Sequence, residues 1–503
     1  MSTLEQCPAE IINYIALFLS LRDICNLRLT SRGLLRVSSG PIFRSDLQQK
    51  HVDITERSLR ALAEATAGPD RLGCYIQDLV LVGVVNNIKF LRQEAKYNAE
   101  DILKHAKAQQ DLKILTQRQK EYEALHSSCG DVLLLSRLFR NLMTHGRRRG
   151  LHSLSLTLVV YREDAQTRLS PADGHGWTLI WKAAADTFHT TMAALAASGI
   201  PVQCLNIYNG VERCSVACNE LSAVNFQFNA LATTLASLKS LAVSFSDRII
   251  NERTEDLGLI GDSADEWEDD WEDELREPED IEHEVYQKLT FSGLPALLQR
   301  CQGLESLELH HYQLKDPGPH DWGLHLYRER FFPCIANIEM DLLPPLKRVV
   351  LRGFRVKSAD ILAFLHRLRP TLEDLSLRHL ILLEGATFES IFKYCTSDEA
   401  GLERLYLDHL LEPVVTASGA YRYRQLLYFT GEPNQVPRLR RGDLPRHGSN
   451  TVDRIGATQI RRPIPYFSVH VPVTDRSRQP TFWPNRRNLH PPWLYDRYEY
   501  GPP

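Results

Sequence analysis

The segment GLESLEL, residues 303–309, returns nearly unchanged as GLERLYL, residues 401–407. Both contain the phrase apolar-x-x-apolar-x-apolar. Its last three positions alternate as the residues of a half-buried β-strand do, and the first leucine turns the chain into that strand. We therefore expect the fold to be built from copies of this phrase.

Eight copies occur in all, and the intervals between them are irregular. Helical patterns lie between the copies, for example over residues 358–369. Repeated strand-and-helix units stack into solenoids. The region resembles a degenerate leucine-rich-repeat solenoid, although the Asn or Cys that usually follows the leucines is missing. The alternative is a general α/β domain with similar strands. The other six copies are Ile76-Leu79-Leu81, Leu151-Leu154-Leu156, Val202-Leu205-Ile207, Leu238-Leu241-Val243, Leu346-Val349-Leu351 and Leu372-Leu375-Leu377.

Length and composition bound what the chain can be. Its 503 residues predict two or three structural units, and 43% apolar residues suffice for a core. A net charge of −4 provides no global field for recruiting nucleic acid or a membrane surface. The sequence has no apolar run of 18 residues and no leading positive cluster, so we expect neither a membrane span nor a signal peptide. These features indicate an intracellular protein, cytoplasmic, nuclear or both, with reduced cysteines.

Residues 4–45 predict a small helical module. Pro8 suits the start of a first helix, and Ser20 with Asp23 has the spacing of a capping box before a second. Ser31 is placed to cap a third helix, which Gly40-Pro41 would end. Three such helices are marginal alone, and their apolar positions are too many for one face. Some of these side chains are therefore expected to meet another protein.

This module resembles an F-box. Cys7-Pro8-Ala9-Glu10-Ile11 follows the family's opening, with cysteine in place of leucine, and residues 27–32 match its Leu/Val-Ser-Arg segment. The resemblance implies docking on the S-phase kinase-associated adaptor of an SCF-type cullin ubiquitin ligase, with the rest of the chain presenting an unknown protein substrate. The residues expected to contact the adaptor are Leu4, Pro8, Ile11, Ile12, Ile15, Leu19, Ile24 and Leu27.

The expected fold class is α/β, with three regions. A three-helix F-box over residues 1–47 precedes an irregular leucine-rich-repeat-like receptor region over 48–412. An extended tail rich in proline, arginine and aromatic residues follows over 413–503. Within this tail, residues 463–473 alternate enough to form an edge strand, and the tail is expected to dock on the solenoid. Its basic-aromatic mixture alone does not favour nucleic acid, because no binding fold accompanies it.

Two insertions interrupt the receptor region. Residues 89–127 predict a mostly solvated helix or helix pair. Residues 252–284 predict a disordered acidic loop, with 14 acidic residues against Arg276 alone between Asp262 and Glu284. Within that loop, Trp267, Trp271 and Leu275 have i, i+4, i+8 spacing, so they could form a partner-binding stripe on a short helix. A solvated tether with incidental tryptophans is the alternative.

Motifs for catalysis are missing from the sequence. There is no P-loop, dinucleotide-binding glycine pattern, nucleophile elbow or zinc-protease motif. Cys204, Cys214 and Cys218 lack the companion ligands of a zinc site, and His310-His311 would point to opposite faces of a strand. We therefore expect no enzyme activity, cofactor or metal. The alternative to a ligase subunit is a scaffold that binds the adaptor outside any ligase.

Overall fold

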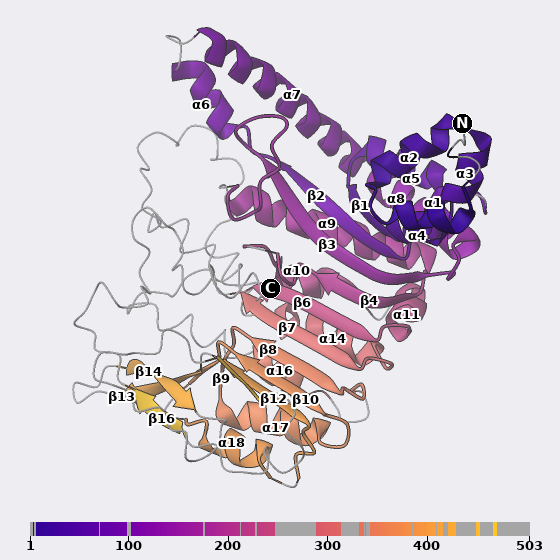
Figure 1. Cartoon of the computed structure of the whole chain (residues 1–503). Coiled ribbons are helices and arrows are strands. Elements are labelled where there is room, and N and C mark those ends of the chain that lie inside the picture. Colours follow the sequence, from indigo (N-terminus) through magenta and orange to yellow (C-terminus); the bar gives the residue numbers. More distant parts are fainter. Residues whose placement is uncertain are drawn as a thin grey trace, which may run out of the picture. The chain divides into compact units, whose positions relative to one another are not determined.

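The chain forms mixed α/β structure with a mostly parallel sheet, seen in a computed structural model (Figure 1). It divides into two compact units, Met1–Leu169 with Asp186–Cys204, and Ser170–Ala185 with Leu205–Pro503. No helix in the described part of the chain is long and apolar enough to cross a membrane. The structure describes residues 4, 7–69, 71–97, 102–174, 177–211, 213–226, 229–246, 288–312, 331–336, 338, 343–383, 386–397, 399–408, 410–415, 421–428, 449–452 and 466–469.

Unit 1 contains three paired parallel strands, and leucines lie opposite leucines in two of them. β2 lies between β1 and β3, with Leu79 opposite Leu154 and Leu81 opposite Leu156. All four leucines are buried. The unit's elements are α1 (Ala9–Ala16), α2 (Leu21–Thr30), α3 (Arg32–Ser38), α4 (Pro41–Asp46), β1 (Gln49–Asp53), α5 (Glu56–Ala65), β2 (Asp78–Asn86), α6 (Lys89–Tyr97), α7 (Ile102–Ser127), α8 (Gly130–His145) and β3 (Leu151–Tyr161). α9 (Trp177–Ser198) and β4 (Val202–Ile207) cross the division between units.

The predicted insertion over residues 89–127 is a helix pair, α6 and α7, and one face of α7 packs on unit 1. Ala108 and Leu115 of α7 are buried with Leu91 of α6 and with Ala165. Arg118 also donates to the carbonyl of Ala165 at 2.8 Å. Only four of the 26 residues of α7 are buried, so most of this helix is solvated as predicted, while one face packs on its own unit.

Unit 2 repeats one strand after another in the same register. β6, β7, β8, β10 and β12 pair in parallel in that order. One buried row across these strands is Leu241, Leu307, Val349, Leu375 and Leu405, and a second is Val243, Leu309, Leu351, Leu377 and Leu407. The last two apolar positions of all eight predicted phrases thus fall on strands: β2, β3, β4, β6, β7, β8, β10 and β12.

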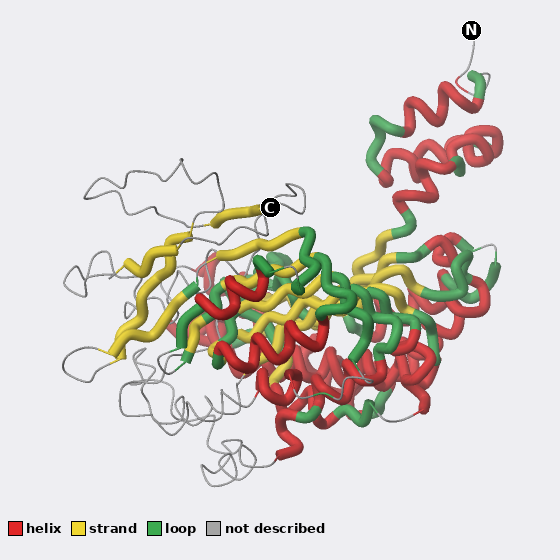
Figure 2. Tube along the Cα trace, turned by 90° about the horizontal axis from the view of Figure 1, so that it is seen from below, coloured by secondary structure: helices red, strands yellow, loops and turns green. Residues whose placement is uncertain are grey.

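The elements of unit 2 follow a repeating order. They are β5 (Val216–Ala217), α10 (Cys218–Ala223), α11 (Asn229–Ala236), β6 (Ser240–Ser246), α14 (Gly293–Arg300), β7 (Ser306–Tyr312), α16 (Phe331–Ala336), β8 (Arg348–Arg352), β9 (Arg355–Val356), α17 (Ser358–Leu368), β10 (Asp374–Arg378), β11 (Ile381–Leu382), α18 (Glu389–Cys395), β12 (Arg404–Asp408), β13 (Leu411–Val415), β14 (Tyr421–Tyr428), β15 (Ser449–Val452) and β16 (Tyr466–Val469). Helices α14, α16, α17 and α18 contact one another in chain order. In Figure 2 the strands and the helices can be followed as separate runs of yellow and red.

The turns of unit 2 also repeat. The carbonyl before each strand accepts two consecutive N–H groups of the next repeat, as Lys347 does from Glu373 and Asp374. After β8, β10 and β12 the chain turns into β9, β11 and β13, which pair in parallel as a second, smaller ladder. Backbone hydrogen bonds between successive copies therefore fix the same conformation at each turn.

Part of the C-terminal tail pairs with the last strands. β15 runs antiparallel to β12, with Leu405 opposite Val452. β14 runs antiparallel to β13 and pairs in turn with β16, which falls within the segment predicted to form an edge strand. These strands cover the exposed backbone edges that β12 and β13 would otherwise present.

Candidate functional site

The N-terminal module consists of four short helices, α1 to α4, where the sequence predicted three. Gly40-Pro41 does not end the module, because Pro41 occupies the first turn of α4, where no N–H donor is needed. The predicted caps are present: the Ser20 Oγ accepts from the Asp23 N–H, and the Ser31 Oγ accepts from the Leu34 N–H. Figure 2 shows the four helices grouped at the N-terminal end.

The module has a small core of its own. Ala16, Ile24 and Phe43 are buried together, and Leu19 packs against them from the edge. The guanidinium of Arg28 lies 3.7 Å from the centre of the Phe43 ring, a cation–π distance. One apolar side chain from each of α1, α2 and α4 therefore holds the module together.

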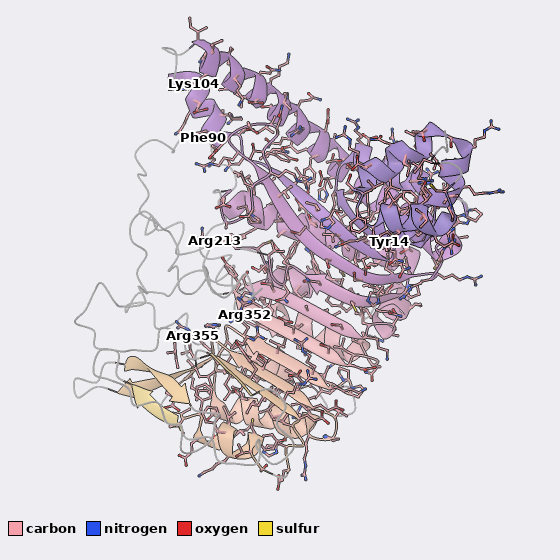
Figure 3. The ribbon with its side chains drawn as sticks, viewed as in Figure 1. Tyr14, Phe90, Lys104, Arg213, Arg352 and Arg355 are labelled. Carbon is pink, nitrogen blue, oxygen red and sulfur yellow. The ribbon has the colours of Figure 1, made fainter. Side chains whose placement is uncertain are left out.

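A second set of apolar side chains faces outward. Ile11 is 49% exposed, Tyr14 62%, Leu17 59% and Phe18 74%. The rings of Tyr14 and Phe18 meet edge to face with centroids 5.4 Å apart. Tyr14 is labelled on α1 in Figure 3. The outward face therefore carries large side chains that the core of the module does not use, which is typical of a protein contact surface.

The residues predicted to bind the adaptor separate into three groups. Leu4, Pro8 and Ile11 are exposed, while Ile15, Leu19 and Leu27 are half-buried. Ile12 and Ile24 are 1% and 0% exposed. The assignment of Ile12 and Ile24 to a contact surface is wrong, because both side chains are already buried within the chain itself.

Sequence reasoning missed Tyr14, Leu17 and Phe18, and also Leu29 and Leu35, which are exposed as well. The spacing of Tyr14, Leu17 and Phe18 at i, i+3 and i+4 was the available signal, since it marks one face of a helix. Helical spacing alone did not show which apolar face pointed inward. The predicted stripe Trp267, Trp271 and Leu275 lies outside the described residues.

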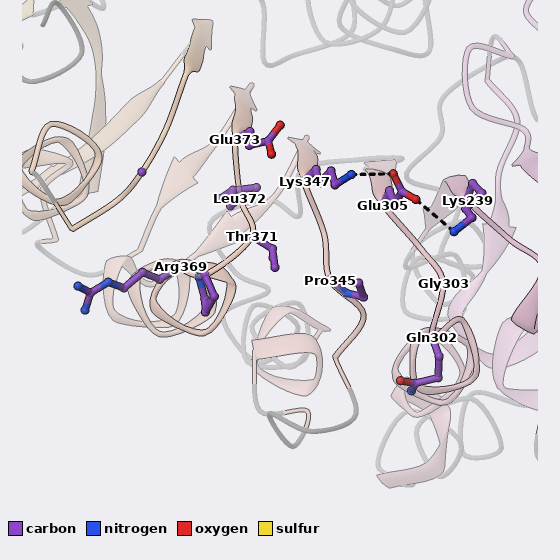
Figure 4. A pocket seen from close by; sticks show the side chains of 12 residues that line it. Lys239, Gln302, Gly303, Glu305, Pro345, Lys347, Arg369, Thr371, Leu372 and Glu373 are labelled. Atoms are coloured by element: carbon purple, nitrogen blue, oxygen red, sulfur yellow. Dashed lines mark hydrogen bonds and ion pairs between the residues drawn. The ribbon is translucent and has the colours of Figure 1, made fainter. Parts of the chain in front are cut away.

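A groove of about 620 Å³ lies in unit 2, where its strands begin. Lys239 and Lys347 line it, and each donates to the carboxylate of Glu305 over 3.1 Å (Figure 4). These hydrogen bonds hold the pKa of Glu305 below its ordinary value. Two lysines share one carboxylate, so the centre of the groove keeps one positive charge in excess.

Across the part of the chain that the structure describes, no group of three His, Cys, Asp or Glu side chains is placed to hold a metal ion. His310 and His311 lie at the end of β7, and the Nδ1 of His310 is 3.2 Å from the Ser244 Oγ. Burial, and then the nearby Arg352, His311 and His379, lower the pKa of His310 well below its ordinary value.

No protein-family model matches the sequence of this chain, and no curated protein matches it either.

Proposed function

We propose that the chain is the substrate-recognition subunit of an SCF-type cullin ubiquitin ligase. In this proposal the α1–α4 module is an F-box that docks on the S-phase kinase-associated adaptor. The observation that carries it is the exposed apolar face of a module whose core is complete without that face. The match of residues 7–11 and 27–32 to the F-box pattern supports the same assignment.

The energetics of the exposed face favour a protein partner. Burying a large apolar side chain is worth about 1.5–3 kcal/mol. Ile11, Tyr14, Leu17 and Phe18 are about half to three quarters exposed, so covering them could contribute several kcal/mol to binding. A helical adaptor that buries this face would provide that contribution, as in other helix-in-groove contacts.

The rest of the chain is proposed to be a degenerate leucine-rich-repeat solenoid that holds a protein substrate. The in-register leucine rows of β6 to β12 and the repeated turn hydrogen bonds support a repeat origin. The receptor would supply no chemistry of its own. It would act by proximity, raising the local concentration of substrate near the ubiquitin-charged enzyme, in the cytoplasm, the nucleus or both.

The test measures binding of the purified chain to the adaptor by calorimetry. Pro8 and Ile11 are both exposed, so replacing both by alanine removes contact area without opening the core. We expect the double variant to bind the adaptor at least tenfold more weakly. The matched control replaces Ile102 and Leu103 of α7, which are 78% and 83% exposed outside the module, and should bind normally.

Unchanged binding by a folded Pro8→Ala/Ile11→Ala variant would refute the F-box assignment. A further measurement separates a ligase subunit from a scaffold. Proteins that co-purify with the chain are incubated with adaptor, cullin and the ubiquitin-charging enzymes. Ubiquitin transfer that requires an intact module supports the ligase role, and adaptor binding without transfer favours the scaffold.

A further inference from the structure

Basic side chains gather at one edge of the unit 1 strands. β1, β2 and β3 run parallel and begin in register, so the segments that precede them meet at the same edge. Arg44 lies in α4, before β1, and Tyr75 ends the short 3-10 helix η2 (Leu72–Tyr75), before β2. The segment before β3 supplies three consecutive arginines. We call these four residues the arginine cluster: Arg44, Arg147, Arg148 and Arg149.

The ring of Tyr75 connects two members of the arginine cluster. The guanidinium carbon of Arg147 lies 4.3 Å from the ring centre, and its Nη2 donates to the Tyr75 hydroxyl oxygen at 2.7 Å. The guanidinium carbon of Arg44 lies 5.6 Å from the same ring centre, within cation–π range. These two distances limit the separation of the two guanidinium carbons to about 10 Å. One ring therefore holds two positive charges close together.

The arginine cluster is accessible and lacks acidic partners. All four side chains are exposed, and none of them forms an ion pair with a carboxylate of the residues that the structure describes. An isolated exposed arginine is common on a protein surface, but four gathered at one edge repel one another and work against the compact fold. A group of unpaired charges that folding does not require is typical of a binding site.

Backbone hydrogen bonds fix the turn that carries three of these arginines. The Arg147 N–H donates to the Cys74 carbonyl at 3.2 Å. The Arg149 N–H donates to the Gly146 carbonyl at 3.1 Å. Arg149 has φ +52°, a left-handed conformation that glycine adopts without strain and arginine does not. An arginine at a position that glycine would occupy more easily points to a role for its side chain.

We propose that the arginine cluster is a binding site for a phosphate monoester. At neutral pH this group carries about 1.5 to 2 negative charges and three acceptor oxygens, so several guanidiniums can contact it at once. A carboxylate offers one charge and two oxygens, which would leave most of the cluster uncompensated. Single-stranded nucleic acid binds by stacking bases on aromatic rings, and the ring of Tyr75 is already in contact with arginines.

A phosphorylated protein side chain and a small organic phosphate both present this group, and the experiment separates these two sources. The arginine cluster contains no residue of the exposed α1 face and none of the leucine rows. The inference therefore goes beyond the proposed ligase function and does not depend on it.

The experiment measures fluorescence anisotropy of a labelled decapeptide, one phosphoserine among glycines and serines, titrated with the full chain. The same peptide without phosphate is the comparison and should not bind. Arg44→Gln/Arg147→Gln should weaken binding of the phosphopeptide at least tenfold, about 1.4 kcal/mol. The matched control, Arg57→Gln/Arg137→Gln, removes the same charge from exposed arginines of α5 and α8 and should change binding less than twofold.

A further variant separates binding from folding. Arg149→Gly relieves the left-handed strain, so it should resist urea at least as well as wild type and yet bind the phosphopeptide at least threefold more weakly. Unlabelled phosphoserine then identifies the source of the ligand. Displacement of the phosphopeptide at concentrations near its own Kd indicates a small organic phosphate, and much weaker competition indicates a phosphorylated protein segment.

Several results would overturn the phosphate site. They are no binding of the phosphopeptide by the folded wild type, equal binding of the peptide without phosphate, unchanged binding by the cluster variants, and equal losses in the cluster and control variants. Tighter binding of a single-stranded oligothymidine with the same total charge would also overturn it, because each phosphodiester carries only one charge.

Discussion

Replacing Gly353 by alanine tests whether the repeated turns of unit 2 are tightly packed. Gly353 follows β8 with φ +76°, a left-handed conformation that costs a residue with a side chain about 1–2 kcal/mol. A Cβ there would lie 2.3 Å from the carbonyl oxygen of His311, which is backbone and cannot simply rotate away. Forcing extra atoms into a packed site costs about 1–3 kcal/mol. We therefore expect Gly353→Ala to destabilise the chain by about 2–5 kcal/mol.

Gly401 provides the matched control. It also has a left-handed φ, +64°, but a Cβ there would meet nothing within 4 Å. Gly401→Ala should therefore cost only the backbone term, about 1–2 kcal/mol. Urea unfolding followed by circular dichroism compares the two variants with wild type, using the midpoint and its slope. Equal losses in the two variants would refute the close approach of the His311 carbonyl to Gly353.

Three other predictions address pH, the exposed helix face and the tail. His310 has a lowered pKa in the folded chain, so the unfolded chain binds its proton more readily. The free energy of unfolding should be highest above about pH 6.5 and should fall on acidification, by at most about 1.4 kcal/mol per pH unit. In His310→Gln this fall should be smaller, which urea unfolding midpoints measured across the pH range would show. Phe18→Ala should weaken adaptor binding roughly 5- to 30-fold by calorimetry, because burying the exposed three quarters of its ring is worth about 1–2 kcal/mol. A chain ending at Val415 loses β14 to β16, so it should melt at lower temperature or aggregate in light scattering, and unchanged behaviour would contradict a capping role.

The parallel strands could be predicted because the same alternation of apolar and other residues, which reflects burial of one strand face, recurs in every copy. In Leu375 and Leu377 the alternation marks the buried face, and a preceding leucine marks the entry of each strand. The matched register follows from the same phrase, since a shift by one residue would turn every leucine out of the core. The helix over residues 358–369 was visible for the same reason and is α17.

Other elements of the fold have sequence patterns too short or too ambiguous to predict. β9 and β11 are two residues long, and no period can be read from two residues. They form because the turns before them are held by hydrogen bonds between repeats, which the local sequence does not encode. α4 was missed because Gly-Pro is a common break, and only its context shows that Pro41 begins a helix. The adjacency of His310, Arg352 and Arg378 across β7, β8 and β10 depends on a register that joins separate copies.

Helix α1 shows why its candidate site was only half predicted. Ile11 and Ile12 are neighbours with the same side chain, yet Ile12 is buried and Ile11 is half exposed. An amphipathic helix identifies its inner face by contrast with a polar outer face. In α1 that contrast is weak, since Tyr14 and Ile11 make the outer face apolar as well. A helix with two apolar faces satisfies one within its own chain, and the other remains as surface that a partner would have to cover. The ambiguity that hid the contact residues from sequence reasoning is thus the property that makes α1 a candidate for protein binding.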